Sequence, residues 1–207
     1  TDMQPGLVTA KFGGSSLSTA AMVRTVVEIV RSDRSRRAIV VSAPGTRYKG
    51  DIKITDLLAA WARDGCAGDS VHFKEVAERF EVLTRDLGVV DFDLPNKLAR
   101  IQSLMVTAKA FTPEILHECA MSRGEWLNAQ LIAHVLGYTF IDAADFISFS
   151  EDGTYHHTAT IRRAEGVRIR ERMADGIVIP GFYGSTVSRA IRTFPRDGSD
   201  ITGSIVA

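Results

Sequence analysis

Residues 194–206 read Phe-Pro-Arg-Asp-Gly-Ser-Asp-Ile-Thr-Gly-Ser-Ile-Val, the pattern of a strand end, a turn and the start of an apolar helix. The turn holds Arg196 and Gly198, and Ser199 and Asp200 stand where the helix would begin. The start of a helix offers unpaired backbone N–H groups and the positive end of the helix dipole. The stretch therefore predicts an anion site where a strand turns into a helix.

A second stretch of the same kind lies near the start of the chain, where residues 7–16 read Leu-Val-Thr-Ala-Lys-Phe-Gly-Gly-Ser-Ser. An apolar strand runs through Lys11 into two glycines and two hydroxyls. The lysine precedes the glycines, so the stretch is neither a Walker A loop nor a dinucleotide-binding fingerprint. Because Lys11 closes what reads as a buried strand, we expect a partner for its ammonium at the carboxyl end of the sheet, where ligands bind in open α/β sheets. Two such sites indicate phosphate binding, and the candidates are Gly13, Gly14, Ser15 and Gly198.

The rest of the chain has the pattern of an α/β protein. Strands are predicted at residues 7–12, 37–43, 138–141, 176–179 and 190–194. Helices are predicted at residues 19–32, 55–63, 70–87, 94–109, 114–121, 125–136 and 159–174. The first strand–helix–strand unit implies a parallel sheet with a right-handed crossover. We therefore expect a three-layer α/β sandwich with a mainly parallel central sheet, one domain over residues 1–207 with a helical insertion at about residues 70–109.

Composition narrows the class of protein. The chain has 207 residues, with 25 basic and 25 acidic side chains and no net charge, so no overall field favours nucleic acid or an anionic membrane. The two cysteines, Cys66 and Cys119, have no metal-ligand spacing and are expected to be free thiols of a reducing compartment. No apolar run reaches the ~18 residues of a membrane span. We expect a cytoplasmic protein that binds neither nucleic acid nor membranes.

Other candidate site residues have structural alternatives. Ser42 follows the second strand and should lie at the same rim of the sheet as Lys11. Thr55 opens the next helix and could serve only as its N-cap. Gly124 and Glu125 stand where a helix is predicted to start, and a glutamate is favoured there by the helix dipole alone. The pair His156 and His157 has no clustered acid or cysteine, so no metal site is predicted. The two tryptophans are expected in the core.

Taken together, several of these motifs carry a family resemblance. They are Lys11-Phe12-Gly13-Gly14-Ser15-Ser16, Val40-Val41-Ser42-Ala43, Gly124-Glu125, Pro180-Gly181-Phe182 and Gly198-Ser199-Asp200-Ile201-Thr202-Gly203. In this order they resemble the catalytic domain of aspartate kinases, within the amino acid kinase family, from residue 7 to the end of the chain.

The resemblance implies transfer of a phosphoryl group from MgATP to the side-chain carboxylate of L-aspartate by a homo-oligomeric enzyme. The acceptor is ionised at neutral pH, so the chemistry needs charge neutralisation and no general base. Lys11 would supply positive charge, and by resemblance Asp200 orients Lys11 and the metal or phosphate network. Glu125 suits the substrate ammonium and Arg196 its α-carboxylate. Further contacts to substrate or phosphate are expected from Ser42, Thr55 and Ser199.

The chain also departs from the family pattern. Asp197 and Pro195 stand where relatives commonly have glycine or serine, and a carboxylate beside the phosphoryl path is repulsive unless it is neutralised. The chain stops at Ala207, before the segment that supplies most of the nucleotide pocket in aspartokinases. One hypothesis is therefore the amino-acid-binding half of a kinase, and the other is a kinase-derived binding module without ATP turnover. A kinase of another amino acid or nucleotide is disfavoured by the motifs at both ends. The 207-residue chain alone is expected to lack turnover.

Overall fold

Two short apolar runs near the start of the chain form neighbouring parallel strands. In the computed structural model, which describes residues 6–195 and 198–207, β1 (Val8–Phe12) pairs with β2 (Arg36–Val41), and α1 (Ala20–Arg31) connects them. The α1 helix begins at Thr19, whose side chain accepts a hydrogen bond from the Met22 N–H, and it buries a face of valines spaced at helical intervals. The predicted strand–helix–strand unit is confirmed.

The central sheet continues with β4 (Ile177–Pro180) and β3 (Thr139–Phe140), in the order β1-β2-β4-β3, and every pairing in it is parallel. In the strand register, Phe12 of β1 pairs with Val41 of β2, and Val41 pairs with Pro180 of β4. The carboxyl ends of three strands therefore meet at one edge, and the residues that follow each strand are brought together there.

The predicted strand at residues 190–194 belongs elsewhere. It forms β6 (Ile191–Thr193), which pairs antiparallel with β5 (Tyr183–Ser185) in a separate two-stranded sheet. Gly184 lies inside β5, although glycine is more typical of turns than of strand interiors. A side chain there would collide with the carbonyl oxygen of Ile147, so the glycine permits a close approach of two backbone segments.

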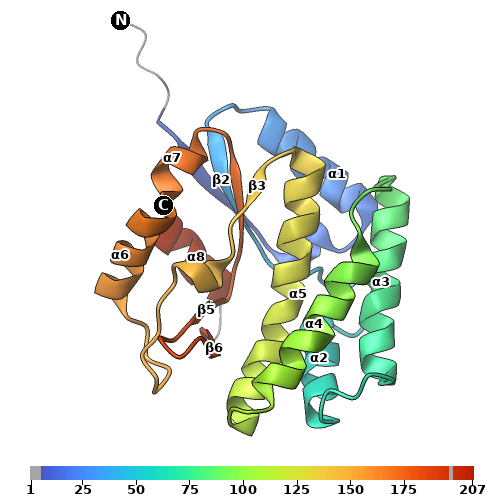
Figure 1. The fold of residues 1–207 in the computed structure, drawn as a ribbon. Helices are drawn as coiled ribbons and strands as arrows, with labels where there is room; N and C mark the ends of the chain where they lie inside the picture. The colour runs from blue at the N-terminus through green and yellow to red at the C-terminus, as the bar shows by residue number, and fades with distance from the viewer. Residues whose placement is uncertain (1–5, 196–197) are drawn as a thin grey trace, which may run out of the picture.

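Helices cover both faces of the central sheet (Figure 1), so the three-layer arrangement is confirmed. One side holds α1 with α2 (Ile54–Arg63), α3 (Val71–Leu87), α4 (Leu94–Ala108) and α5 (Pro113–Leu136), and the other side holds α6 (His157–Val167), α7 (Ile169–Met173) and α8 (Gly198–Val206). Two 3₁₀ turns, η1 (Gly14–Leu17) and η2 (Ala143–Asp145), complete the described elements. None of the helices in the described ranges is both long and apolar enough to cross a membrane.

The α5 helix is continuous, so the predicted break at Gly124 is wrong. A Cβ atom on Gly124 would lie 2.9 Å from the Cβ of Ala43 and 3.1 Å from Cγ2 of Ile54. Glycine is therefore required in mid-helix to let α5 lie directly against the loop that follows β2. Its cost in helix propensity, about 1 kcal/mol relative to alanine, is offset by this packing.

The predicted helix at residues 159–174 is also wrong as a single element. Arg168 has a left-handed backbone, with φ of 59°, and divides it into α6 and α7. The N–H of Arg168 donates to the carbonyls of Ala164 and Glu165 and so closes α6. The nearest glycine, Gly166, lies inside α6, so no glycine or proline marks this boundary in the sequence.

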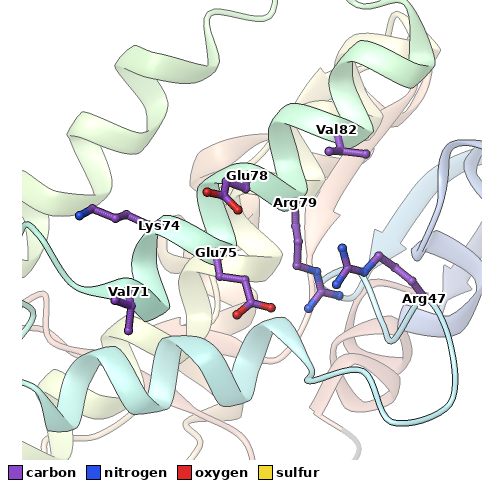
Figure 2. Close-up of a pocket in the computed structure, with 7 residues that line it drawn as sticks. All are labelled: Arg47, Val71, Lys74, Glu75, Glu78, Arg79 and Val82. Carbon is purple, nitrogen blue, oxygen red and sulfur yellow. The ribbon is translucent and has the colours of Figure 1, made fainter.

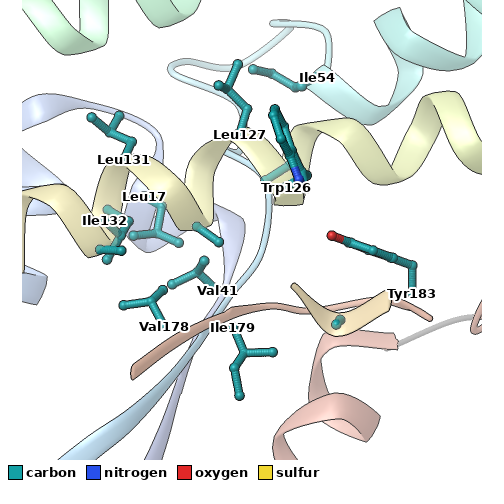
Figure 3. Close-up of a cluster of buried hydrophobic side chains, with 14 of the residues drawn as sticks. Leu17, Val41, Ile54, Trp126, Leu127, Leu131, Ile132, Val178, Ile179 and Tyr183 are labelled. Atoms are coloured by element: carbon teal, nitrogen blue, oxygen red, sulfur yellow. The ribbon is translucent and has the colours of Figure 1, made fainter. Parts of the chain in front are cut away.

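The main core lies between α5 and the central sheet (Figure 3). Leu127, Leu131 and Ile132 of α5 lie above Val41 and Val178 of the strands, whereas Ile179 points to the other face of the sheet, and all of these side chains are buried. Trp61 and Trp126 are buried as predicted. Cys66 and Cys119 are free thiols, and burial raises the pKa of both.

Candidate active site

Lys11 lies next to the end of β1 and forms an ion pair with α8. Its Nζ lies 2.9 Å from Oδ1 of Asp200, in the first turn of α8, and its side chain is 27% exposed. This supplies the partner expected for the ammonium at the carboxyl edge of the sheet. However, β1 is the edge strand and is only half-buried, so the expectation of a buried strand is wrong.

Ser42, directly after β2, is held from three directions. Its N–H donates to the carbonyl of Phe12 at 3.1 Å, and its hydroxyl lies 2.8 Å from the hydroxyl of Ser199. Asn128 of α5 donates from Nδ2 to the Ser42 carbonyl at 2.7 Å. Asn128 is fully buried, and its position three residues after Glu125 is the signal that could have found it.

The predicted phosphate-binding glycines have different local roles. The Gly14 carbonyl accepts a hydrogen bond from the Gly45 N–H at 2.8 Å, and a Cβ on Gly14 would lie 2.9 Å from the carbonyl oxygen of Ala43. A Cβ on Gly198 would lie 2.8 Å from the Phe182 ring. Close packing with neighbouring atoms therefore explains why both positions hold a glycine. Among the described residues, a Cβ on Gly13 would have only the ammonium of Lys11 near it, at 3.6 Å.

A pocket of about 320 Å³ opens at the strand ends. Its lining consists of Gly14, Ser15, Ser42, Ala43, Pro44, Gly45, Thr46, Lys53, Thr55 and Glu125. Five predicted site residues are thus brought together from η1, the loop after β2, α2 and α5. Lys11, Ser199 and Asp200 are linked to this group through Ser42 and its hydrogen bond to Ser199. Arg196 and Asp197 lie outside the described residues.

Glu125 lies in the middle of α5, so the prediction that it starts a helix is wrong. Its side chain lines the pocket although the residue is only 5% exposed. Its Oε2 is buried and has no hydrogen-bond partner among the described residues. Burial raises the pKa of Glu125 from its ordinary value of 4.5 to about 8, although backbone N–H groups and Arg123 favour the ionised form. A buried acceptor of this kind calls for a ligand that donates hydrogen bonds and carries positive charge.

A second pocket, of about 480 Å³, lies against α3, away from the strand ends (Figure 2). Its lining consists of Arg47, Val71, Lys74, Glu75, Glu78, Arg79 and Val82. None of these residues is singled out by the sequence. The lining mixes both signs of charge with exposed valines, and Arg79 is turned inward to the loop after β2. The pocket at the strand ends is therefore the stronger candidate for a ligand-binding or catalytic site.

A profile of the amino acid kinase family matches residues 7–207. This chain belongs to the amino acid kinase family. The match covers the central sheet, both helical layers and every residue of the strand-end pocket.

Individual relatives confirm the resemblance to aspartokinases. The chain is 35% identical over 205 residues to Aspartokinase 3 of Bacillus subtilis (strain 168), covering 95% of this chain and 45% of that protein. The crystal structure of Clostridium acetobutylicum aspartate kinase matches with a TM-score of 0.85 and 34% identity, over 98% of this chain and 45% of the other. Aspartokinase III of Escherichia coli, solved in complex with aspartate and ADP, shares the fold with a TM-score of 0.78 and 23% identity, over 97% of this chain and 46% of the other. The chain therefore spans less than half the length of each of these relatives.

Proposed function

We propose that this chain is the amino-acid-binding part of an aspartokinase, which transfers the γ-phosphoryl group of ATP to the side-chain carboxylate of L-aspartate. The observation that carries the proposal is the buried Glu125 carboxylate with an unpartnered oxygen, in the same pocket as Ser42 at the strand ends. A complex of the Escherichia coli relative with aspartate and ADP supports the choice of substrates. We propose residues 1–207 as one domain, in which α3 and α4 are the helical insertion.

The amino-acid end of the site uses Glu125 and the start of α2. Glu125 accepts hydrogen bonds from the substrate ammonium, and Thr55 and Ser42 contact the substrate from the facing walls. Arg196, predicted as the partner of the α-carboxylate, lies outside the described residues, and its role stays a prediction. The pocket of about 320 Å³ suits a small amino acid.

The phosphoryl end uses Lys11, Ser199 and the glycines at the strand ends. Since the acceptor carboxylate is already ionised, Lys11 has to neutralise charge on the transferring group, with Gly13, Gly14, Ser15 and Gly198 beside the phosphates. Mg²⁺ would neutralise phosphate charge when ATP is bound. The described residues contain no cluster of three His, Cys, Asp or Glu side chains, but Mg²⁺ on nucleotides commonly needs only one or two carboxylates. Asp200, with a side chain 61% exposed, fits that need.

A coupled assay for acyl phosphate tests the proposal in the product of the full-length gene. The parent should form acyl phosphate from L-aspartate and MgATP. Lys11→Ala should lower turnover by orders of magnitude while aspartate affinity stays within a few-fold. Lys49→Ala, an exposed lysine outside both pockets, is the matched control. Aspartate binding without any acyl phosphate would favour the rival hypothesis, a binding module derived from a kinase.

The oligomeric state, the cellular location and the partners of this enzyme are also part of the proposal. We expect a homo-oligomeric cytoplasmic enzyme that takes ATP and L-aspartate as partners and neither nucleic acid nor membranes. The balanced charge of the chain supports the exclusion of polyanionic partners. Light scattering of the full-length protein tests the oligomeric state.

A further inference from the structure

Asn128 contacts the backbone at the point where β2 leaves the central sheet. The carbonyl of Val41, the last residue of the strand, accepts a hydrogen bond from the Gly181 N–H at 2.9 Å. The next carbonyl, that of Ser42, lies beyond the strand, and among the described residues the Asn128 amide is its donor, at 2.7 Å. A side chain of α5 therefore takes the place of the strand partner that β2 lacks at this residue.

The Asn128 amide is only half satisfied. The residue is fully buried, and its Oδ1 has no hydrogen-bond partner among the described residues. A buried polar atom without a partner costs at least as much free energy as a typical hydrogen bond contributes, so the bond made by Nδ2 is offset at Oδ1. Net stability therefore gives little reason for an amide at this position, whereas the hydrogen bond fixes the Ser42 peptide group.

Two other residues of α5 act on the same short segment. A Cβ atom on Gly124 would lie 2.9 Å from the Cβ of Ala43, so the backbone of the helix lies against the loop. Burial raises the pKa of the Glu125 carboxyl, and a hydrogen bond from the Ala43 N–H acts against this by favouring the ionised form. The peptide group after Ser42 thus faces Asn128 with its carbonyl and Glu125 with its N–H, and α5 limits its rotation from both sides.

The orientation of this peptide group constrains the Ser42 backbone and with it the direction of the Ser42 side chain. The Ser42 hydroxyl lies 2.8 Å from that of Ser199. Ser199 is itself fixed by packing, since a Cβ on Gly181 would lie 2.5 Å from the Ser199 Cβ. Misplacement of a group in an active site by about 1 Å can lower a rate about 100-fold. The position of the serine pair therefore depends on how firmly Ser42 is held.

We propose that Asn128 is a positioning residue that fixes the backbone of Ser42 and thereby holds its hydroxyl against Ser199, where the amino-acid end and the phosphoryl end of the site meet. The inference rests on the proposed function, because it takes the Ser42–Ser199 pair as part of the phosphoryl-transfer site. Asn128 is not among the residues that line the pocket, so it acts through Ser42.

A double-mutant cycle between Asn128 and Ser42 tests this role in the full-length gene product. Asn128→Leu removes the amide at similar size and should lower kcat for acyl phosphate formation roughly tenfold, with the KM for L-aspartate within about threefold, because Glu125 and Thr55 still bind the substrate. In a Ser42→Ala background, the same change should lower kcat by less than about twofold. The shift in the denaturation midpoint should be equal in both backgrounds, because Ser42→Ala keeps the carbonyl that Asn128 binds.

Gln130→Met is the matched control. Gln130 is an amide of the same helix, but it donates to the Trp126 carbonyl and accepts from Lys97 instead of contacting the loop after β2, so this change should leave kcat as in the parent. Asn128→Ala removes the amide without adding an apolar branch, and it gives the same cycle if Asn128→Leu does not fold.

Two kinetic results would overturn the assignment. An unchanged kcat in Asn128→Leu would show that the hydrogen bond is not needed for turnover, and an equal loss in both backgrounds would show that Asn128 does not act through Ser42. Failure of the proposed function is a separate outcome, in which the parent forms no acyl phosphate from aspartate. A crystal structure of the Asn128→Leu protein then decides the inference, because loss of the Ser42–Ser199 hydrogen bond supports it and an intact pair contradicts it.

Discussion

Glu118 and Glu125 lie about two helical turns apart on the same side of α5. The Glu118 carboxylate accepts hydrogen bonds from the Thr193 N–H at 2.7 Å and from Nε of Arg192 at 3.0 Å, whereas Glu125 lines the pocket. Glu118 therefore holds β6 from the side of α5. A single helix therefore contacts both β6 and the pocket.

Glu118→Gln is expected to destabilise the protein by ~2–3 kcal/mol, because it removes a charged acceptor from the nearly buried Arg192. Turnover should fall as well, because Glu118 and the pocket residue Glu125 belong to the same helix. Chemical denaturation and the coupled assay measure both effects. Glu114→Gln is the matched control, because Glu114 contacts the same arginine at 3.2 Å with a side chain 71% exposed and should change stability by less than ~0.5 kcal/mol. Equal effects of the two variants would contradict the role of Glu118.

Gly124→Ala is expected to destabilise the protein by about 1–3 kcal/mol, although alanine is the better helix former. The added methyl group would press on Ala43 and Ile54 and move α5 away from the pocket. Thermal denaturation measures the effect. Gly166→Ala in α6 is the control, because none of the described residues beyond its own helical backbone and chain neighbours lies within 4 Å of the added Cβ, and it should stabilise the protein by up to ~1 kcal/mol. A stabilising effect of Gly124→Ala would show that the close contact is relieved easily.

Arg79→Met is expected to free the loop after β2 from α3. Two carbonyls lose their donor, and Asp51 keeps only Arg47, so we expect a loss of ~2–3 kcal/mol in stability and a higher KM for aspartate with little change in kcat. Denaturation and steady-state kinetics measure these effects. Glu78→Gln, an exposed change on the same helix, should affect neither.

Glu125 makes stability depend on pH in the empty protein. Because burial raises its pKa from 4.5 to about 8, the folded state retains a proton that the unfolded state has lost between these values. The stability that Glu125 contributes is therefore complete below pH 4.5 and is lost as the pH rises to about 8. Glu125→Gln should flatten this decline in the free energy of unfolding, measured by denaturation across that range. Identical pH profiles for parent and variant would show that the carboxyl is solvated.

The strand ends and the residues around them were predictable because parallel strands align their carboxyl ends. Apolar runs that stop at Gly13 and Ser42 predict a shared rim without any tertiary information. The start of α8 was predictable for a similar reason, since Gly198 and Ser199 combine turn and helix-start preferences.

Long-range contacts decided the features that local patterns could not predict. Gly124 reads as a helix break because its tertiary contact with Ala43 is invisible in the sequence. Arg79 reads as one more polar residue on an amphipathic helix, and its partners come from a loop far back in the chain. Strand β5 is too short to show an alternating pattern, and it forms because β6 and the segment around Ile147 lie beside it.

The hydroxyls of Ser42 and Ser199 form a hydrogen bond in which either oxygen can be the donor. Rotation about two C–O bonds reverses its direction without any movement of the backbone. At each oxygen, this reversal exchanges a hydroxyl proton available to an acceptor for a lone pair available to a donor. The pair can therefore match either a donor or an acceptor at the junction of β2 and α8 without any change in the fold.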